Sequence, residues 1–451
     1  MPDPVEDLRD HLAPIEDLKA AAAVLRWDQE TYMPEGGGEA RAQQLSTLQS
    51  SAHERFVAEK TGELLDRAAD TLDDPDPLDP DAALVRATRR DYERAVRVPA
   101  SLVAELSKAQ SQAQQAWTQA RANDDFSRFA PHLERLVDLS VEKAEARKPS
   151  GYEDELYDAL LTEYEPGRTT AEVASLFEAL RDDLVPLVDA IASAPQVDDG
   201  ILRGTYPQAR QQEFGRSVIA DFGYDFDRGR QDVSAHPFTT SFSPNDVRLT
   251  TRYDEDNVAS ALFSTIHEAG HGLYEQGIDP DLDPFYRAIN RVEPSLIRVE
   301  ADEVTYNLHV MLRFELERGL IDGTVSVNEL PTRWNKAMDD YLGVVPETNA
   351  NGVLQDVHWA QGAFGYFPTY TLGTLTAAQL LEAIEEDIPD LDQQIAEGKF
   401  EPLLDWLRTH VHRHGRKLEA PDLLEHTTGE ALSPDAWLRY VRDKFGPLYD
   451  L

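Results

Sequence analysis

The sequence predicts a mostly α-helical protein with one small antiparallel β-hairpin or sheet, and two observations lead to that fold class. From residue 5 to about residue 195, Leu, Ala and Val recur at three- and four-residue steps between charged residues, as they do in amphipathic helices. Residues 230–255 are instead rich in Thr, Val, Leu and Phe, and Ser243-Pro244-Asn245-Asp246 interrupts them as a turn. They predict a short antiparallel hairpin, after which the helical pattern resumes.

Breaks between the predicted helices coincide with proline, glycine and acidic residues. These breaks lie at 33–38, 73–80 and 164–167, and later near Gly323, Pro346 and Pro368. No repeat of fixed period and no low-complexity segment divides the chain. The length of 451 residues allows two or three ordinary domains or one large helical body.

The charge of the chain is strongly negative. Lys and Arg number 43 against 84 Asp and Glu, which gives a net charge of −41. Such a chain repels nucleic acid and anionic membranes, so we exclude both as partners. Most basic residues are Arg, and an acidic, lysine-poor surface is expected of a halophilic protein, because in molar salt the Debye length falls to about 3 Å and self-repulsion is screened. The alternative is an ordinary acidic protein of a mesophile.

The chain contains no Cys. Disulfides and thiolate metal ligands are therefore excluded, and a reducing compartment is favoured. The stretch Met1-Pro2-Asp3-Pro4-Val5-Glu6-Asp7 is acidic and lacks the apolar core of a signal peptide. No apolar run approaches the roughly 18 residues that span a bilayer. Together these features predict a soluble, cytoplasmic protein.

The strongest chemical signal is the sequence His-Glu-x-x-His at 267–271, within a predicted helix over 263–274. Positions i and i+4 share one face of a helix, so His267 and His271 can point two imidazoles at one metal ion. Glu268 then lies beside the metal, placed to take a proton from an activated water. The alternative is a buried helix whose histidines form hydrogen bonds within the core.

A hydrolytic zinc site usually takes three protein ligands and leaves one position for water. A third ligand often comes from a carboxylate on a following helix, some 20 or more residues on. The acidic residues in that range are Glu293, Glu300, Asp302 and Glu303. Because most acidic residues of this chain are surface charges, the sequence does not choose among these four.

Two arginines are candidates for binding a substrate. Arg298 closely follows the predicted metal helix, and a guanidinium suits a bidentate grip on a carboxylate. The alternative, which spacing alone favours, is an arginine that pairs with Glu300 or Asp302 to hold two helices together. Arg248, on the predicted hairpin, could face a substrate or pair across the strands.

The stretch from His358 to Tyr370 is a candidate for stabilising charge in a reaction. A His and a Tyr are donor types that stabilise an oxyanion during attack on an amide carbonyl. Considered alone, an aromatic run near Pro368 also suits core packing.

Taken together, these residues resemble the M32 family of metallocarboxypeptidases, the thermostable carboxypeptidase Taq type. The resemblance extends over nearly the whole chain, because its motifs occur in the family's order. They are Trp27 to Pro34, His236-Pro237-Phe238, Asp246 to Thr250 (D-x-R-x-T), His267 to His271 (H-E-x-x-H), Ile297 to Asp302 (I-R-x-x-A-D) and His358 to Tyr370.

The resemblance implies a large helical, zinc-dependent body with a deep cleft, usually a homodimer, that removes residues one at a time from peptide C-termini. It implies that His267 and His271 bind one Zn²⁺ per chain, with Co²⁺ or another divalent ion as a substitute, and that Glu268 is the general base. His358 and Tyr370 would stabilise the oxyanion. Arg298 and Arg248 would recognise the substrate's terminal carboxylate or limit the peptide's reach, and His236 would bind substrate. The resemblance also implies a single peptidase domain over residues 1–451, with an N-terminal helical part of about 1–195 and a catalytic part of about 196–451.

One motif of the family is missing. The family carries H-E-S-(A/G)-Q between H-E-x-x-H and I-R-x-x-A-D, and its Glu is the third zinc ligand. No His-Glu-Ser occurs here, and Gly277-Ile278-Asp279-Pro280 runs almost directly into a stretch starting at Asp283 that the family places several dozen residues later. Three interpretations follow: a deletion variant that holds zinc weakly, a substitute acid such as Glu293, or a segment that this sequence omits. In the first, the chain is a catalytically impaired relative that binds peptides or is silent.

Overall fold

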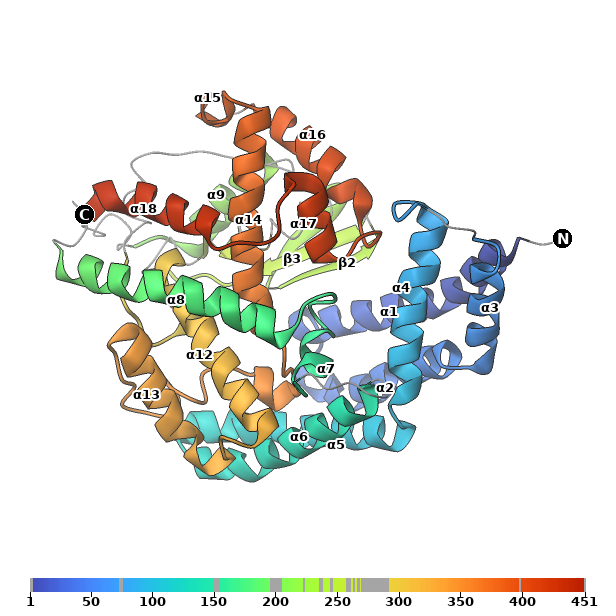
Figure 1. The fold of residues 1–451 in the computed structure, drawn as a ribbon. Coiled ribbons are helices and arrows are strands. Elements are labelled where there is room, and N and C mark those ends of the chain that lie inside the picture. The colour runs from blue at the N-terminus through green and yellow to red at the C-terminus, as the bar shows by residue number, and fades with distance from the viewer. Residues whose placement is uncertain are drawn as a thin grey trace. The chain divides into compact units, whose positions relative to one another are not determined.

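A computed structural model of the chain describes residues 3–72, 76–148, 155–194, 205–221, 224–234, 238–243, 246–256, 261–262, 264–265, 268, 292–396 and 399–449. The fold is mostly helical with one small sheet, which confirms the predicted fold class (Figure 1). The cleft that the resemblance implies stays a prediction. In the part of the chain that is described, we find no helix with the length and apolarity needed to cross a bilayer.

The chain forms two compact units that alternate along the sequence. Unit 1 consists of Met1–Ala95, Asp198–Ile289 and Ile384–Leu418, and unit 2 consists of Val96–Val197, Asn290–Ala383 and Glu419–Leu451. The predicted division near residue 195 lies close to the point where the chain passes from unit 2 to unit 1, between Val197 and Asp198. The single peptidase domain with parts of about 1–195 and 196–451 stays a prediction.

Four long helices begin unit 1. They are α1 (Pro4–Thr31), α2 (Gly38–Phe56), α3 (Glu59–Ala69) and α4 (Pro80–Arg97). Asp3 caps α1 by accepting a hydrogen bond from the N–H of Val5, and Pro4 occupies the first turn, where no N–H is needed. Leucines of α1 and α3 pack with Val85 of α4 into a small core. The other helices of unit 1 are α9 (Gln208–Asp221), α15 (Leu391–Ala396) and α16 (Glu401–His410).

The sheet of unit 1 has three strands: β1 (Gly229–Val233), β2 (Thr239–Ser243) and β3 (Asp246–Thr251). Strands β2 and β3 pair antiparallel, which confirms the predicted hairpin, but β1 adds a parallel partner on the other edge of β3. The sequence did not predict β1, because Arg-Gln-Asp lacks the alternation of apolar residues that indicates a strand. Gly229 permits the pairing, since a Cβ there would lie 2.2 Å from the carbonyl oxygen of Val247.

Unit 2 is a helical body around one large hydrophobic core. Its main helices are α5 (Ala100–Asn123), α6 (Phe126–Arg147), α8 (Thr170–Ser193), α12 (Glu303–Asp322), α13 (Leu330–Leu342), α14 (Pro368–Asp387, whose last residues belong to unit 1), α17 (Ala420–Thr428) and α18 (Asp435–Tyr449). Helix α12 packs against α6, α8 and α13, and most of its residues are buried (Figure 1). Short helical segments connect these helices: α7 (Asp158–Leu161), η3 (Arg298–Glu300) and η5 (His358–Gln361).

Candidate active site

In unit 1, the start of the predicted metal helix is helical and buried. Ala261, Leu262, Thr265 and Glu268 have helical backbone conformation, and each is at most 6% exposed. The remaining positions that matter for a metal, His267 and His271, lie outside the described residues, as does His236. Within the described part, no three His, Asp or Glu side chains gather in a metal-binding arrangement.

The small sheet fixes the position of Glu268. The hydroxyl of Thr239 on β2 lies 2.7 Å from Oε2 of Glu268 and 2.8 Å from its carbonyl oxygen. One turn earlier, Thr265 accepts a hydrogen bond from Gln231 of β1 at 3.0 Å and bonds to Thr251 of β3 at 3.1 Å. All three strands therefore contribute a side chain that holds this helical segment, and the Glu268 carboxylate is fixed before any substrate binds.

The D-x-R-x-T motif is part of the same sheet. Asp246 and Arg248 form a bidentate ion pair, with N···O distances of 2.8 and 2.9 Å. The guanidinium of Arg248 also lies over the ring of Trp27, 4.4 Å from its centroid. Arg248 thus pairs with a carboxylate on its own strand, whereas the alternative considered from sequence was a pair across strands.

Thr250, the last residue of that motif, is fully buried and anchors the chain on both sides of His236. Its hydroxyl lies 2.7 Å from the hydroxyl of Ser234 and accepts a hydrogen bond from the N–H of Phe238 at 2.9 Å. Thr250 therefore ties Ser234 and Phe238 to β3.

In unit 2, the structure brings His358 and Tyr370 together. Nε2 of His358, on η5, lies 3.2 Å from the hydroxyl of Tyr370, in the first turn of α14. The imidazole also packs on the ring of Phe367, with a centroid distance of 4.6 Å. Burial raises the pKa of Tyr370 well above its ordinary value, so its hydroxyl stays protonated and can donate.

Arg298 lies beside this pair but is already held by other groups. It is 4% exposed. Its Nε and Nη2 donate to Oδ1 of Asp356 at 3.2 and 2.8 Å, and its Nη1 donates to the hydroxyl of Tyr306 at 2.7 Å. Its guanidinium lies 4.8 Å from the ring centroid of Tyr370. The partner is therefore Asp356 and not Glu300 or Asp302, which corrects the ion pair considered from the sequence.

Asp356 is shared by two buried arginines, because Arg313 of α12 donates to its other oxygen at 2.7 Å. Burial alone would raise the pKa of Asp356, but the guanidinium groups of Arg313 and Arg298 hold it well below its ordinary value. The carboxylate is therefore charged throughout the working range of pH. It also lies 3.8 Å from Nδ1 of His358.

Asp302, one candidate for the third metal ligand, is a helix cap. Its carboxylate accepts hydrogen bonds from the N–H groups of Glu293, Val304 and Thr305 and from the hydroxyl of Thr305, at 2.7 to 3.1 Å. Four donors use all the lone-pair positions of a carboxylate. Asp302 therefore begins α12 and has no position left for a metal.

Another candidate, Glu303, belongs to a contact between α12 and α18. It accepts a hydrogen bond from the hydroxyl of Tyr440 at 3.2 Å and pairs with Lys444. Glu293 and Glu300 are the two exposed members of the set.

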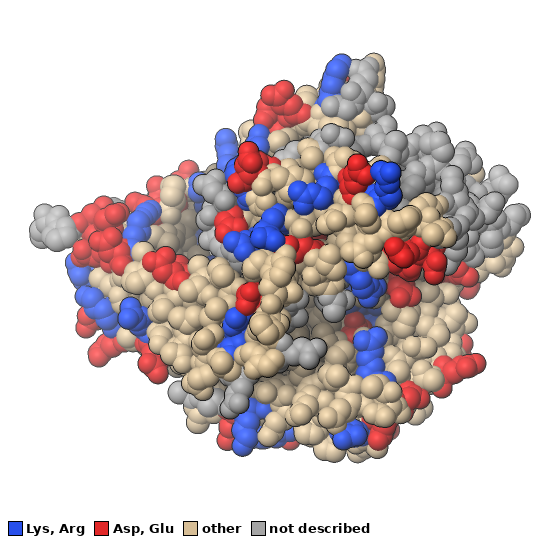
Figure 2. Space-filling view, turned by 180° about the vertical axis from the view of Figure 1, so that it is seen from behind, with Lys and Arg blue, Asp and Glu red and all other residues tan. Residues whose placement is uncertain are grey.

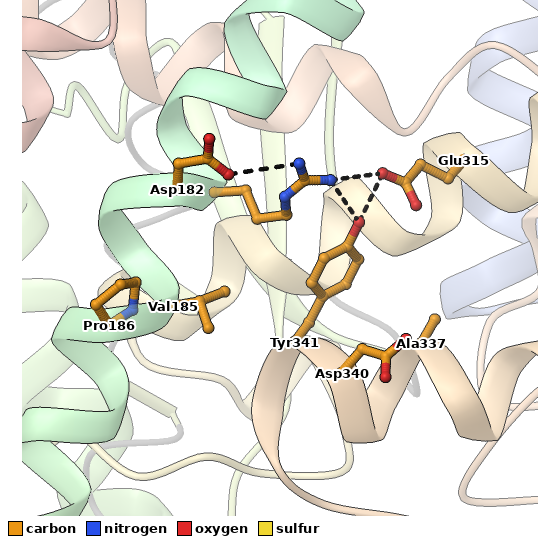
Figure 3. A pocket seen from close by; sticks show the side chains of 8 residues that line it. Asp182, Val185, Pro186, Glu315, Ala337, Asp340 and Tyr341 are labelled. Atoms are coloured by element: carbon orange, nitrogen blue, oxygen red, sulfur yellow. Dashed lines mark hydrogen bonds and ion pairs between the residues drawn. The ribbon is translucent and has the colours of Figure 1, made fainter.

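A pocket of about 450 Å³ lies between α8, α12 and α13, away from these residues (Figure 3). Its charged groups are already paired, since Arg181 donates to Glu315 at 3.4 Å and to the hydroxyl of Tyr341 at 3.3 Å. That hydroxyl in turn donates to Glu315 at 2.6 Å. None of the residues that line this pocket is a predicted site residue.

Sequence reasoning missed Thr239 and two buried charges of α12, Arg313 and Glu317. A usable signal existed for the charged pair: Arg313 and Glu317 stand one turn apart inside a largely apolar run, and a charge in such a run needs a buried partner. No sequence signal distinguishes Thr239 from the other threonines of the hairpin.

Known proteins resemble the chain along nearly its full length. The sequence profile of the family described as Carboxypeptidase Taq (M32) metallopeptidase matches residues 7–284 and 279–445. Thermostable carboxypeptidase 1 of Thermus thermophilus is 40% identical over 490 residues, covering 96% of each protein. Carboxypeptidase 1 of Bacillus subtilis is 36% identical, over 98% of this chain and 97% of that protein. The crystal structure of the M32 carboxypeptidase from Deinococcus radiodurans shares 38% identity with a TM-score of 0.93, over 99% of this chain and 100% of that one.

The match to this family profile, together with the mostly helical fold, identifies a metallopeptidase. The chain belongs to the M32 family of metallocarboxypeptidases, the carboxypeptidase Taq family. Membership supports a peptide hydrolase of carboxypeptidase type and implies a divalent metal cofactor.

The matches also concern the missing motif. The two parts of the family match meet at residues 279–284, where the sequence lacks H-E-S-(A/G)-Q. The alignment with the Thermus relative runs over 490 residues, more than the 451 of this chain. Residues present in the relative therefore have no counterpart here.

Proposed function

We propose that this chain is a zinc-dependent carboxypeptidase that releases amino acids from the C-termini of peptides. The observation that supports it best is the Glu268 carboxylate, 6% exposed and fixed by Thr239 within H-E-x-x-H. A buried glutamate with a defined orientation, next to two histidines at metal-binding spacing, is what water activation requires.

Zinc, when held by His267 and His271, would polarise the scissile carbonyl and make water more acidic. Glu268 would accept the proton of the attacking water and pass it to the leaving amine. Thr239 would keep one carboxylate oxygen hydrogen-bonded, so that the other faces the water. His358 and Tyr370 would donate to the oxygen that becomes negative during attack.

For the substrate's terminal carboxylate, we propose Arg248 and His236 as the main binding groups and Arg298 as a secondary one. Because Arg298 already donates to Asp356 and Tyr306, its main effect would be to hold Tyr370 in place. Arg248 keeps its ion pair with Asp246 and its stacking on Trp27, which would orient the guanidinium for a carboxylate.

For the third metal ligand, we propose a substitute acid such as Glu293 or Glu300, or a residue of a segment that this sequence omits. Asp302 and Glu303 are held by other groups. A specific observation favours a second candidate function: the absence of H-E-S-(A/G)-Q at the point where the family match divides. If no acid replaces that glutamate, two histidines hold zinc weakly, and the chain is a catalytically impaired relative that binds peptides or is silent.

Metal content, intact mass and peptidase activity, measured on one preparation in high salt, test these proposals. We expect about one zinc per chain, a mass matching 451 residues, and stepwise release of C-terminal residues, with no release from a peptide whose C-terminus is amidated. One zinc with a larger mass would show that a segment is missing from the sequence. No zinc and no release at the matching mass would favour the impaired relative. Replacement of zinc by cobalt tests the choice of ion.

We also propose a homodimer and a cytoplasmic location. Light scattering in molar salt is expected to give twice the chain mass of 50.6 kDa, and fractionation of the native host should recover the protein with cytosolic markers. A monomer at micromolar concentration would refute the dimer.

A further inference from the structure

A buried carboxylate outside the predicted site connects α12 to the stretch that carries His358. Glu317 has no exposed surface. It accepts hydrogen bonds from the hydroxyl of Tyr157 at 2.5 Å, the indole N–H of Trp359 at 2.9 Å and the backbone N–H of Gly365 at 2.9 Å. Three donors from three segments therefore converge on one carboxylate, which fixes those segments relative to α12.

Two of these donors lie between His358 and Tyr370 in the sequence. Trp359 directly follows His358 in η5, and Gly365 precedes the aromatic turn that leads to Tyr370. Gly365 has a φ of +89°, and a Cβ there would lie 2.7 Å from the carbonyl carbon of Leu160. Its backbone therefore packs closely against α7, and a side chain at this position has no room.

The same helix also holds the residues on the other side of His358. Arg313, one turn before Glu317, donates to Asp356 at 2.7 Å and to Oε1 of Gln355 at 2.9 Å. Arg313 and Glu317 of α12 therefore form hydrogen bonds to residues on both sides of this histidine in the sequence.

We propose that Glu317 is a positioning residue for the reaction: from α12 it fixes η5 and the following turn, so that Nε2 of His358 stays within hydrogen-bond distance of the Tyr370 hydroxyl. Because Glu317 is fully buried, its effect passes through Trp359 and Gly365 and not through contact with substrate. The inference rests on the carboxypeptidase function proposed above.

Glu317→Gln tests this role, because an amide has about the same size but offers an N–H group where the site requires an acceptor. We expect kcat to fall about tenfold or more while KM changes less than about twofold, as for a displaced catalytic group. Glu315→Gln is the matched control on the same helix, since the Glu315 side chain is 49% exposed and its partners among the described residues are Arg181 and Tyr341. A Glu317→Gln protein with kcat within twofold of the unmodified chain overturns the proposal.

If Glu317→Gln does not fold, two Trp→Phe variants decide the question. Trp359→Phe removes the N–H donor to Glu317 and keeps an aromatic ring. Trp437→Phe removes a similarly buried indole whose N–H has no hydrogen-bond partner among the residues that the structure describes. We expect kcat to fall only for Trp359→Phe, and equal kcat values at equal loss of stability would refute the positioning role.

A second measurement separates this inference from the proposed function. In protein with ¹³C-labelled histidines, assigned with a His358→Gln sample, the ring resonance of His358 should shift in Glu317→Gln and stay in place in Glu315→Gln. An unmodified chain that releases no C-terminal residues would refute the carboxypeptidase function, while the resonance would still test the positioning. An unshifted resonance overturns the positioning.

Discussion

Asp356 neutralises two buried charges in the interior of unit 2, because Arg298 and Arg313 both pair with it. Asp356→Asn leaves two buried guanidinium groups without the negative charge of their shared carboxylate. Breaking a buried ion pair from one side typically costs about 3–5 kcal/mol, so we expect a loss of unfolding free energy of that size. Thermal and urea unfolding check this, with the exposed Asp340→Asn as a control expected to change stability by less than about 0.5 kcal/mol. Equal stability of the two variants would contradict the prediction.

Glu317 makes stability depend on pH near neutrality. Burial raises the pKa of Glu317 to about 7, although Tyr157, Gly365, Trp359 and Arg313 all favour its charged form. An acid whose pKa rises on folding binds more protons in the native state. Its contribution is therefore fully present below the ordinary pKa of 4.5 and is lost as pH rises to about 7.

Unfolding of the unmodified chain and of Glu317→Gln between pH 4.5 and 8 measures this dependence. We expect the difference in unfolding free energy between the two proteins to change by up to about 3 kcal/mol over that window, with the unmodified chain losing stability towards high pH. A difference that stays constant with pH would place the native pKa of Glu317 near its ordinary value.

At the scale of elements, the parallel pairing of β1 with β3 depends on Gly229. Gly229→Ala would put a Cβ 2.2 Å from the Val247 carbonyl oxygen and 2.3 Å from the Tyr224 hydroxyl. We expect a loss of about 1–3 kcal/mol, as for other overpacked sites, together with faster amide exchange in β1. Gly373→Ala, in α14 with open space around the glycine, should instead be neutral or stabilising. Unchanged exchange in β1 would refute the role of Gly229.

Prediction from sequence succeeded where the pattern is local. The hairpin of β2 and β3 follows from β-favouring residues on either side of Pro244-Asn245, and the helical conformation of Thr265 and Glu268 follows from the apolar spacing around them. Strand β1 was missed because Arg230, Gln231 and Asp232 show no strand pattern, and only the neighbouring β3 makes them a strand.

Side-chain partners across long separations were not predictable by spacing. Arg298 finds Asp356 58 residues away, whereas the two acids close to it in sequence were the partners considered. Asp302 is unavailable because it caps α12, a role that depends on where the helix begins. His358 and Tyr370, by contrast, are only twelve residues apart and lie in contact. The family resemblance had already grouped them.

At the scale of the whole molecule, the net charge of −41 predicts how the fold responds to salt. Acidic and basic side chains are interspersed on the face shown in Figure 2, and the excess of acid must be screened. Since the Debye length shortens from about 10 Å at 0.1 M to about 3 Å at 1 M, we expect the thermal midpoint to rise steadily with KCl up to molar concentrations. Sucrose at matched osmolality separates screening from solvent exclusion. A midpoint that is flat in KCl would favour the ordinary mesophile protein.

The alternation of the two units along the sequence has a consequence for synthesis on the ribosome. Unit 1 begins with Met1–Ala95 but needs Ile384–Leu418 to be complete, and unit 2 needs the final stretch from Glu419. At a translation rate of roughly 5–20 residues per second, about 15–60 s pass between synthesis of the first four helices and synthesis of Ile384–Leu418. Unit 1 of the nascent chain therefore stays incomplete for most of translation, and we expect the yield of folded protein to depend on chaperones that act before release.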